Sequence, residues 1–559
     1  MWPFQWLLPP NSSFSRQRRT RLEALPVHEQ GASFVQYDEC AVRYTMPSMN
    51  EVGPRNTTPI VVGAKAAVVV FAALFVAIFY YIAFHRFRYP LQLEWIEGGV
   101  LEMAQRAAAH QPIYAAPTKS YIALIYTPLY AYIAAALSRF SGMNVTTLRL
   151  ISILATSGCF VVIFSFVRRI SRDSFAALLA CGLFAALYGQ SNGWFDLARV
   201  DMLYLFFLLL GIDAAQRGWP IWSAIAFAMA VQTKQSGLVI AVFVLAHEIR
   251  RPRKLIEGLG TFALAAGGSY WWFNHQSDGW YRYYTVFLPS HQAWMMSKLA
   301  IFSLQDVARP LGIAVVVTLL AWVLTVGKED EDSRQRYFIG LTSVGILISS
   351  LSSRLHLGGS TNVCLPLYAW ICMLFGLSVS LVIAWTKRAP VGIAPALQLV
   401  VLAACGVQFL QLVYHPSLFV PTAEQNAYAK EVSNRLSSVH GEIFVFHNVV
   451  GSDWGEPARV TNMIAVWDVL RADHGPAAQR LHNELIRSFQ QKEYAGVLSE
   501  GAPTDLDAWE TDELKDIANA AAAAYPSQQR LIPQPQWNSF YYNPATPLIR
   551  PQYLYMASR

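Results

Sequence analysis

Three glutamates stand close together in the stretch LEWIEGGVLEMAQR, residues 93–106, which follows the first long hydrophobic run of the chain. A carboxylate beside a lipid bilayer is costly and usually marks a functional site. Such a carboxylate can take the proton of a hydroxyl group while the hydroxyl oxygen attacks a second substrate. We therefore expect at least one of these acids, with Glu94 and Glu97 as the candidates, to act as a catalytic base.

Other polar and charged residues recur near the ends of later hydrophobic runs. They are Arg199 and Asp201 in FDLARVD, Lys234 and Gln235 in VQTKQSG, His291 in the loop 275–300, and Arg354, His356 and Asn362 in SRLHLGGSTN. Two or three acids that converge with several cations are suited to bind an anionic lipid next to a reacting hydroxyl.

Each candidate also has a structural interpretation, which the sequence leaves open. An acid in the first turn of a helix interacts favourably with the helix dipole, which applies to Glu94 and Glu97. Asp201 opens an apolar helix and is suited to cap it. Lys234 and Arg354 have side chains long enough to reach the headgroups from a buried backbone position.

The composition places these residues in a membrane protein. The chain of 559 residues is 54% hydrophobic and 14% charged, whereas soluble domains carry about a quarter charged residues. Runs such as 60–84 and 391–413 are long enough to cross about 30 Å of hydrocarbon. The six cysteines are scattered without a CxxC pair, so neither a disulfide framework nor a zinc site is expected.

Short basic clusters between the hydrophobic runs indicate the topology. They are RQRRTR (17–22), RRISR (168–172), RRPRK (250–254) and TKR (386–388). All four lie in the cytoplasm, as the positive-inside rule requires, if the N-terminus is cytoplasmic and about eleven helices cross the membrane. The segment 121–140, with a helix-breaking Pro128, then stays in the outer leaflet. This topology brings the polar candidates to the outer face of the membrane. The basic residues form no stripe of the kind that binds nucleic acid, so nucleic-acid binding is not expected.

Three regions follow from the pattern. Residues 1–58 are predicted to be a largely disordered cytoplasmic tail, 59–414 the transmembrane catalytic domain, and 415–559 a small extracytoplasmic α/β domain. In the last region we expect strands at 442–450 and 494–500 and helices at 422–438, 476–492 and 508–524. The aromatic residues of WNSFYY, 537–542, fit a domain core better than a sugar-stacking surface.

The order of the motifs resembles a known superfamily. EWIEGG is followed by YTPLY (126–130), ARVD, TKQSG, and HLGGSTN with LPLY (365–368) after it. Over residues 60–414 this resembles the GT-C superfamily of integral-membrane glycosyltransferases, in the branch of the protein O-mannosyltransferases and the lipid A aminoarabinose transferase. The resemblance implies an inverting transfer of a monosaccharide from a polyprenyl-phosphate donor on the extracytoplasmic face, with an acid of the first outer loop as the base.

The resemblance also suggests roles for the individual residues. Glu-Gly at 97–98 matches the family's second acidic position, so Glu97 is the expected base, with Glu94 as its partner and Asp201 orienting the acceptor or Arg199. The other expected ligands of the substrates are Lys234, Arg354, His356 and Arg199 for the donor phosphate, and Tyr126, Gln235, Asn362 and His291 for the rest of the substrates.

Two departures from the family pattern affect these roles. Ile96 precedes Glu97, where the family often has two adjacent acids, and YTP at 126–128 replaces a common KPP. The chain has no DxD motif, so no metal and no cofactor are expected.

The expected partners are the lipid-linked donor, membrane lipids, and a glycan, lipid or protein acceptor of the cell envelope. The expected location is the bacterial inner membrane, with the C-terminal domain in the periplasm or outside the cell. A transporter or flippase of an anionic or lipid-linked substrate is the main alternative, although transporters usually show internal repeats and a midplane site. A membrane-anchored binding protein is a third interpretation, which leaves the acids and cations unexplained.

Overall fold

The computed structural model describes residues 58–94, 96–325, 330–390, 392–446, 461–499, 502–504, 511–530 and 553–557. Residues 1–57 of the expected cytoplasmic tail and the WNSFYY segment lie outside this part of the chain. Everything below refers to the described residues of the unit from Thr57 to Arg559.

Long apolar helices dominate the first three quarters of the structure. Five helical segments among the described residues are long and apolar enough to cross a membrane. They are α1 (Pro59–Arg86), α4 (Val145–Ser171), the segment Lys298–Leu324 that contains most of α14 (Arg309–Thr325), the segment Arg334–Leu355 of α15 (Asp330–Leu355), and Thr361–Thr386 with α16 (Leu365–Thr386). The chain is thus a polytopic helical membrane protein, and the number of eleven crossings stays a prediction.

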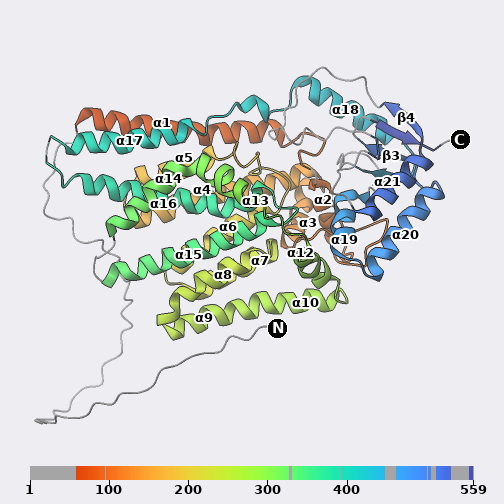
Figure 1. The fold of residues 1–559 in the computed structure, drawn as a ribbon, viewed down its shortest axis with the longest axis horizontal. Helices are drawn as coiled ribbons and strands as arrows, with labels where there is room; N and C mark the ends of the chain where they lie inside the picture. The colour runs from red at the N-terminus through yellow and green to blue at the C-terminus, as the bar shows by residue number, and fades with distance from the viewer. Residues whose placement is uncertain are drawn as a thin grey trace, which may run out of the picture. The chain divides into compact units, whose positions relative to one another are not determined.

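Shorter helices complete the bundle. They are α5 (Ser174–Ala186), α6 (Asp201–Gln216), α7 (Pro220–Thr233), α8 (Gly237–Leu245), α9 (Pro252–Phe262), α10 (Gly268–Gln276) and α17 (Ala394–Leu410). In Figure 1, α1 lies beside α17 and α5, while α4 packs between α5, α6 and α16. The side chains of Asn144 and Asp173 accept hydrogen bonds from backbone N–H groups at the starts of α4 and α5, which caps both helices.

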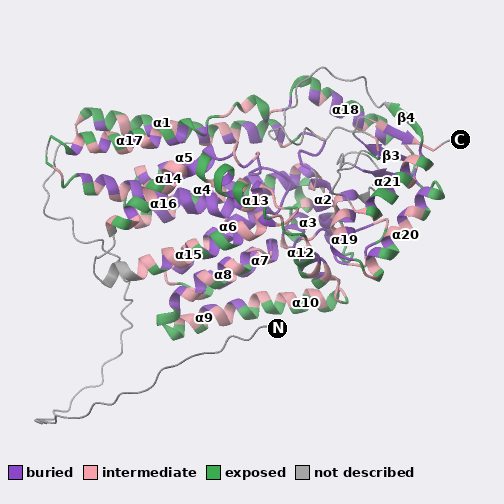
Figure 2. Ribbon diagram, viewed as in Figure 1, coloured by how far each residue is buried: buried purple, intermediate pink, exposed green. Residues whose placement is uncertain are grey.

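The burial pattern separates inner from outer helices (Figure 2). In α16 most of the span is buried, whereas α1 buries only a third of its apolar window. The outward side of α1 exposes large apolar side chains such as Ile60, Val70 and Phe84. A soluble protein rarely exposes so extended an apolar surface. These helix faces are therefore suited to contact lipid.

Two short helices follow α1 without the length to span a bilayer. In α2 (Glu97–Ala108) the apolar face of Val100, Met103, Ala104 and Ala107 is buried. The next helix, α3 (Leu129–Ser141), begins directly after Pro128, and its 13 residues extend about 20 Å. This is shorter than the hydrocarbon core of about 30 Å, as expected for a segment that does not cross.

A mixed β-sheet forms the C-terminal region. Its strand order is β2-β1-β3-β5-β4, with β1 parallel to both β2 and β3, and β5 antiparallel to its two neighbours. The strands are β1 (Ile443–Val445), β2 (Thr461–Asn462), β3 (Gly496–Ser499), β4 (Ser527–Arg530) and β5 (Tyr553–Met556). The helices of this region are α18 (Ala423–Ser437), α19 (Met463–Ala472), α20 (Pro476–Gln490) and α21 (Asp512–Ala524).

Some of these elements were expected from the sequence and some were not. The expected strands at 442–450 and 494–500 correspond to β1 and β3, and the three expected helices correspond to α18, α20 and α21. The sequence did not indicate α19 or the antiparallel edge made by β4 and β5. These two short strands pair only with each other and with β3.

Candidate functional site

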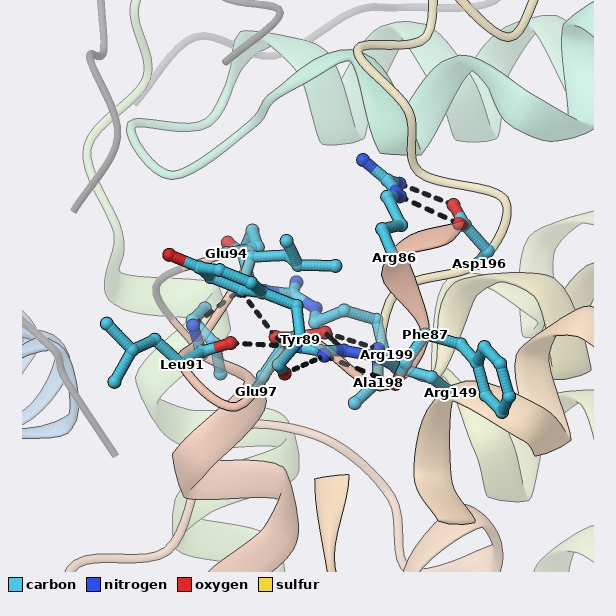
Figure 3. Close-up of polar contacts among 12 residues, drawn as sticks. Arg86, Phe87, Tyr89, Leu91, Glu94, Glu97, Arg149, Asp196, Ala198 and Arg199 are labelled. Atoms are coloured by element: carbon cyan, nitrogen blue, oxygen red, sulfur yellow. Dashed lines mark hydrogen bonds and ion pairs between the residues drawn. The ribbon is translucent and has the colours of Figure 1, made fainter. Parts of the chain in front are cut away.

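The loop between α1 and α2 is held by a fully buried ion pair. Arg149, in the second turn of α4, donates from Nε to Glu97 Oε1 (3.0 Å) and from Nη2 to Glu97 Oε2 (2.6 Å). Two backbone N–H groups, of Leu93 and Ala198, also donate to the Glu97 carboxylate, at 2.7 and 2.8 Å. Figure 3 shows how these contacts join three segments that are distant in sequence. Glu97 therefore lies where the sequence placed it, but it is enclosed by four donors.

Arg199 bridges the neighbouring acid and a tyrosine. Its Nη1 donates to Glu94 Oε2 at 2.6 Å, and its Nη2 donates to the hydroxyl of Tyr126 at 2.7 Å. The guanidinium also lies over the ring of Trp194, at 4.7 Å from the centroid. All four side chains come from non-helical segments that meet at the end of the bundle facing the C-terminal region.

Asp201 connects this group to two further segments, the end of α7 and the turn before α16. Its Oδ1 accepts hydrogen bonds from Lys234 Nζ (2.6 Å) and from Asn362 Nδ2 (2.9 Å). Its Oδ2 lies 3.6 Å from Arg199 Nε. The structure thus joins Glu94, Arg199, Asp201 and Lys234 into one chain of alternating charges, as the predicted common sidedness requires. We call this group, with Tyr126 and Asn362, the Arg199 site.

Several polar atoms in or beside the Arg199 site are buried without a hydrogen-bond partner among the described residues. They are Arg199 Nε and Asp201 Oδ2, which face each other in the 3.6 Å ion pair, and Gln235 Oε1 and Trp194 Nε1 beside the site. Buried polar atoms in proteins are nearly always hydrogen-bonded to protein or water. Several unsatisfied atoms in one place are therefore consistent with a site that receives polar substrate groups or ordered water.

Glu94 and Glu97 differ in their electrostatics although they are three residues apart. Burial raises the pKa of Glu94 above its ordinary value, and the positive charge of Arg199 offsets this only in part. For Glu97, burial is outweighed by the charge of Arg149 and by its hydrogen bonds, so that its pKa lies below the ordinary value. The two carboxylates therefore differ in how strongly they bind a proton.

A second cluster adjoins the Arg199 site. Arg354 donates from Nε to Asp306 Oδ2 (2.7 Å) and from Nη1 to the carbonyl oxygen of Gly359 (2.6 Å). Lys298 Nζ donates to the carbonyl oxygens of residues 356, 357 and 359. Arg354 and Lys234 both act electrostatically on the thiol of Cys364, so the two clusters are neighbours.

His356 and His291 have different surroundings. The ring of His356 lies tilted against that of Trp294, with centroids 4.3 Å apart. Burial and the nearby charge of Lys298 hold the pKa of His356 below its ordinary value. The expected role of His356 in binding the donor phosphate stays a prediction. His291 is exposed, and its ring nitrogen contacts only Phe287 and Ser290. The structure does not bring His291 to the Arg199 site.

Gln235 lies beside the Arg199 site rather than within its hydrogen-bond chain. Its Nε2 donates to the backbone carbonyl of Ile125 at 2.9 Å, next to Tyr126. The other substrate-binding candidates, Tyr126 and Asn362, contact Arg199 and Asp201 directly.

Three buried charged residues near these loops were not singled out from the sequence: Arg149, Arg86 and Asp196. Arg149 is a single arginine inside an apolar run, which by itself indicates a buried partner. Arg86 forms a buried ion pair with Asp196, in which Nε donates to Oδ2 at 2.8 Å. These charges position the loops that carry the site, because each guanidinium also donates to backbone carbonyl groups.

Within the described ranges, no group of three or more histidine, cysteine, aspartate or glutamate side chains is arranged to hold a metal ion.

Comparison with known proteins bears on this arrangement. The family model of glycosyltransferase family 87 matches residues 124–353. The chain has no significant sequence match among curated proteins. Among solved structures it is similar to ArnT from Cupriavidus metallidurans bound to undecaprenyl phosphate, with 12% identity, a TM-score of 0.52, and coverage of 78% of this chain and 93% of that one. The apo state of the same protein gives 11% identity, a TM-score of 0.49, and coverage of 78% and 94%.

The likeness to the lipid-bound structure, at 12% identity, establishes a shared fold. The family match covers residues 124–353, which contain Arg199, Asp201 and Lys234. Together they confirm the resemblance that the sequence motifs indicated.

Proposed function

We propose that this chain, an integral-membrane glycosyltransferase of the GT-C superfamily, moves a monosaccharide from a polyprenyl-phosphate donor to an acceptor hydroxyl, with inversion at the anomeric carbon. The observation that carries the proposal is the bridge that Arg199 makes between Glu94 and Asp201. It joins two carboxylates and a guanidinium in one site, which supports a proton acceptor beside phosphate-binding cations. The structure of ArnT with undecaprenyl phosphate, which shares this fold, supports a lipid-phosphate donor.

The charges of the two clusters suit a phosphodiester. Four cations face three carboxylates there: Arg199, Lys234, Lys298 and Arg354 against Glu94, Asp201 and Asp306. The pair of Glu97 and Arg149 neutralises itself. Within these two clusters the cations outnumber the carboxylates, which supports the binding of an anionic donor. Prearranged cations stabilise the further negative charge that develops on the leaving phosphate.

The proposed reaction is a single displacement. The acceptor hydroxyl gives its proton to the Glu94 carboxylate as its oxygen forms a bond to the anomeric carbon. The bond from that carbon to the phosphate oxygen breaks, and its electron pair leaves with the polyprenyl phosphate. The raised pKa of Glu94 makes it the better proton acceptor of the two glutamates. Lys234 and Arg354 hold the phosphate, and Asp201 keeps Arg199 and Lys234 in place.

We place the site on the extracytoplasmic face of the inner membrane, with residues 415–559 as the extracytoplasmic domain and 59–414 as the catalytic domain. The direction of α4 supports this orientation. Arg149 lies near its start, whereas Arg168 and Arg169 lie in its last turn. A helix of 27 residues is about 40 Å long, so this basic cluster is a bilayer's thickness away from the site.

The Glu94→Gln variant tests the proposal. Purified protein in lipid nanodiscs is given undecaprenyl-phosphate sugars, together with membranes from a strain that lacks the chain as the acceptor source. We expect the wild type to release undecaprenyl phosphate, and Glu94→Gln to be about 10²–10⁴-fold slower with unchanged affinity for undecaprenyl phosphate. The matched control is Glu257→Gln, in an exposed pair with Arg253, which should keep full turnover.

Two results would count against this proposal. Normal turnover of the Glu94→Gln variant would remove Glu94 from the chemistry. Failure of the wild type to release undecaprenyl phosphate from any donor, or transport of the donor without its cleavage, would remove the transferase activity itself.

A further inference from the structure

A polar hollow lies between the loop that joins α2 to α3 and helix α20 of the C-terminal region. Its volume is about 260 Å³, and every residue that lines it is polar or charged. Lys119 comes from the loop, and the other lining residues belong to α20 or to the turn that follows it. Such a lining offers no apolar surface to a lipid tail, whereas it can form hydrogen bonds with a ligand rich in hydroxyl or charged groups.

The turn that carries Lys119 is held in place by its own contacts. The backbone N–H groups of Thr118 and Tyr121 each donate to the carbonyl oxygen of the other residue, at 3.1 and 3.2 Å. The hydroxyl of Tyr121 donates to the carbonyl oxygen of Ile113 at 2.6 Å. The guanidinium of Arg106, in α2, lies 3.9 Å from the centroid of the Tyr121 ring. The wall of the hollow opposite α20 is therefore formed before any ligand binds.

Lys119 engages both acids of the hollow. Its backbone N–H donates to Glu484 Oε2 at 3.2 Å, and its Nζ forms an ion pair with Glu493. The two other cations of the lining, Arg480 and Arg487, are exposed. Among the described residues, no acid or other acceptor pairs with either guanidinium. These two arginines are therefore the cations that a ligand in the hollow can bind.

The spacing of the polar residues along α20 places them in one row. Arg480 and Arg487 are seven residues apart, so they lie on the same face of the helix with their backbones separated by about 10 Å. Asn483 lies between them and Gln491 lies one turn beyond Arg487. A guanidinium binds a carboxylate or phosphate through two parallel hydrogen bonds, and amides bind hydroxyl groups. The row thus suits a sugar that carries an anionic group.

The hollow is separate from the Arg199 site but close to it along the chain. No residue of the Arg199 site lines the hollow. Lys119 and Tyr126 are seven residues apart, a distance that an extended chain spans in at most about 25 Å. A glycan of several sugar units is long enough to occupy both places at once.

We propose that the hollow between Lys119 and α20 binds a saccharide with a carboxylate or phosphate group, as a distal unit of the acceptor glycan. The acceptor role rests on the proposed function and adds to it a contact away from the reacting hydroxyl. Binding energy that is equal in the ground state and the transition state lowers the acceptor concentration needed without changing the maximal rate. The hollow should therefore affect acceptor saturation alone.

Binding of small sugars tests the site without relying on turnover. Purified protein in nanodiscs of zwitterionic lipid is titrated by calorimetry with trigalacturonate, with mannose 6-phosphate and with neutral maltotriose. We expect the wild type to bind at least one of the two anionic sugars, which identifies the anionic group, and not to bind maltotriose. The double variant Arg480→Gln/Arg487→Gln should bind that sugar about tenfold more weakly, the lower end for a hydrogen bond to a charged group because both guanidiniums are exposed.

Two further double variants serve as controls. Arg435→Gln/Lys515→Gln removes the same charge from exposed ion pairs on α18 and α21 and should keep the wild-type affinity. Arg480→Lys/Arg487→Lys keeps the charge and should retain part of the affinity, which guards against misfolding. Binding of maltotriose as tight as that of the anionic sugars, or equal losses in the two Gln double variants, would overturn the inference.

A turnover measurement separates this inference from the proposed function. Membranes from a strain lacking the chain are titrated as the acceptor at a fixed donor concentration. Arg480→Gln/Arg487→Gln should raise the half-saturating amount of acceptor about tenfold, while the maximal rate and the affinity for undecaprenyl phosphate stay unchanged. A wild type that binds the anionic sugar but releases no undecaprenyl phosphate would overturn the proposed function and the acceptor role, and would leave the saccharide site standing.

Discussion

Two glutamates of one short loop, Glu94 and Glu97, show how much the role of a side chain depends on its donors. Glu97 accepts four hydrogen bonds, two of them from Arg149. Glu94 Oε2 accepts hydrogen bonds from the backbone of Ile96 and from Arg199, which also faces Asp201. The first arrangement fixes the loop on α4. The contacts of Glu94 leave the charge of Arg199 shared between Glu94 and Asp201, so that a bound substrate could take the place of one of these two acids.

This difference predicts that Glu97→Gln acts on stability. Removing one partner of a buried ion pair leaves the other charge uncompensated, here that of Arg149, which is inaccessible to solvent. We expect the free energy of unfolding to fall by about 3–5 kcal/mol, as measured by denaturation of the purified protein in mixed micelles. The exposed control Glu257→Gln should change it by less than about 0.5 kcal/mol.

The contrary result is equally informative. A Glu97→Gln variant with unchanged stability and no turnover would identify Glu97 as the proton acceptor, as its position in the motif suggested. The geometry of the four donors would then have to open during the reaction.

At the scale of the elements, close helix contacts depend on residues without side chains. Gly182 in α5 faces α1, and a Cβ atom at this position would lie 2.4 Å from the Cα atom of Ala72. Small residues allow membrane helices to approach this closely. The contact matters for the site because α1 ends at Arg86, which holds the 193–196 loop through Asp196 and Gly193.

We therefore expect Gly182→Ala to force α1 and α5 apart. Overpacking of this kind costs about 1–3 kcal/mol and should appear as a lower midpoint of unfolding together with reduced turnover. Gly63→Ala is the matched control, since a Cβ atom at Gly63 in α1 would meet nothing within 4 Å. Equal stability of the two variants would show that the helices separate without cost.

The elements themselves were more predictable than the contacts between them. Hydrophobic runs indicated α1, α4 and α16, because a bilayer demands long apolar helices. Pro128 indicated the start of α3, since proline ends or begins a helix. Nothing comparable indicated that Arg149 binds Glu97 or that Arg199 binds Glu94. Such pairings depend on tertiary packing, and a single sequence contains no record of which of its charges meet.

At the scale of the whole chain, the candidate site lies at the end of the membrane helices that faces the C-terminal region. The loops that carry Glu94, Arg199, Lys234 and Asn362 lie at the end of the helices where α19 is docked (Figure 1). The basic end of α4 lies at the other end of the bundle. In the proposed reaction, a lipid donor would enter from the bilayer and a polar acceptor from the aqueous side, so that neither substrate would have to leave its own solvent.

This arrangement predicts the accessibility of single cysteines in whole cells. All cysteines among the described residues are buried, so the remaining Cys40 is replaced by serine and one exposed position is changed at a time. A membrane-impermeant maleimide should label the Gln491→Cys variant, next to α20, in spheroplasts. It should label the Arg253→Cys variant, within the 250–254 basic cluster, only after the membrane is permeabilised. The reverse pattern would place the Arg199 site on the cytoplasmic face, where the proposed lipid-linked donor would have to be presented from the opposite leaflet.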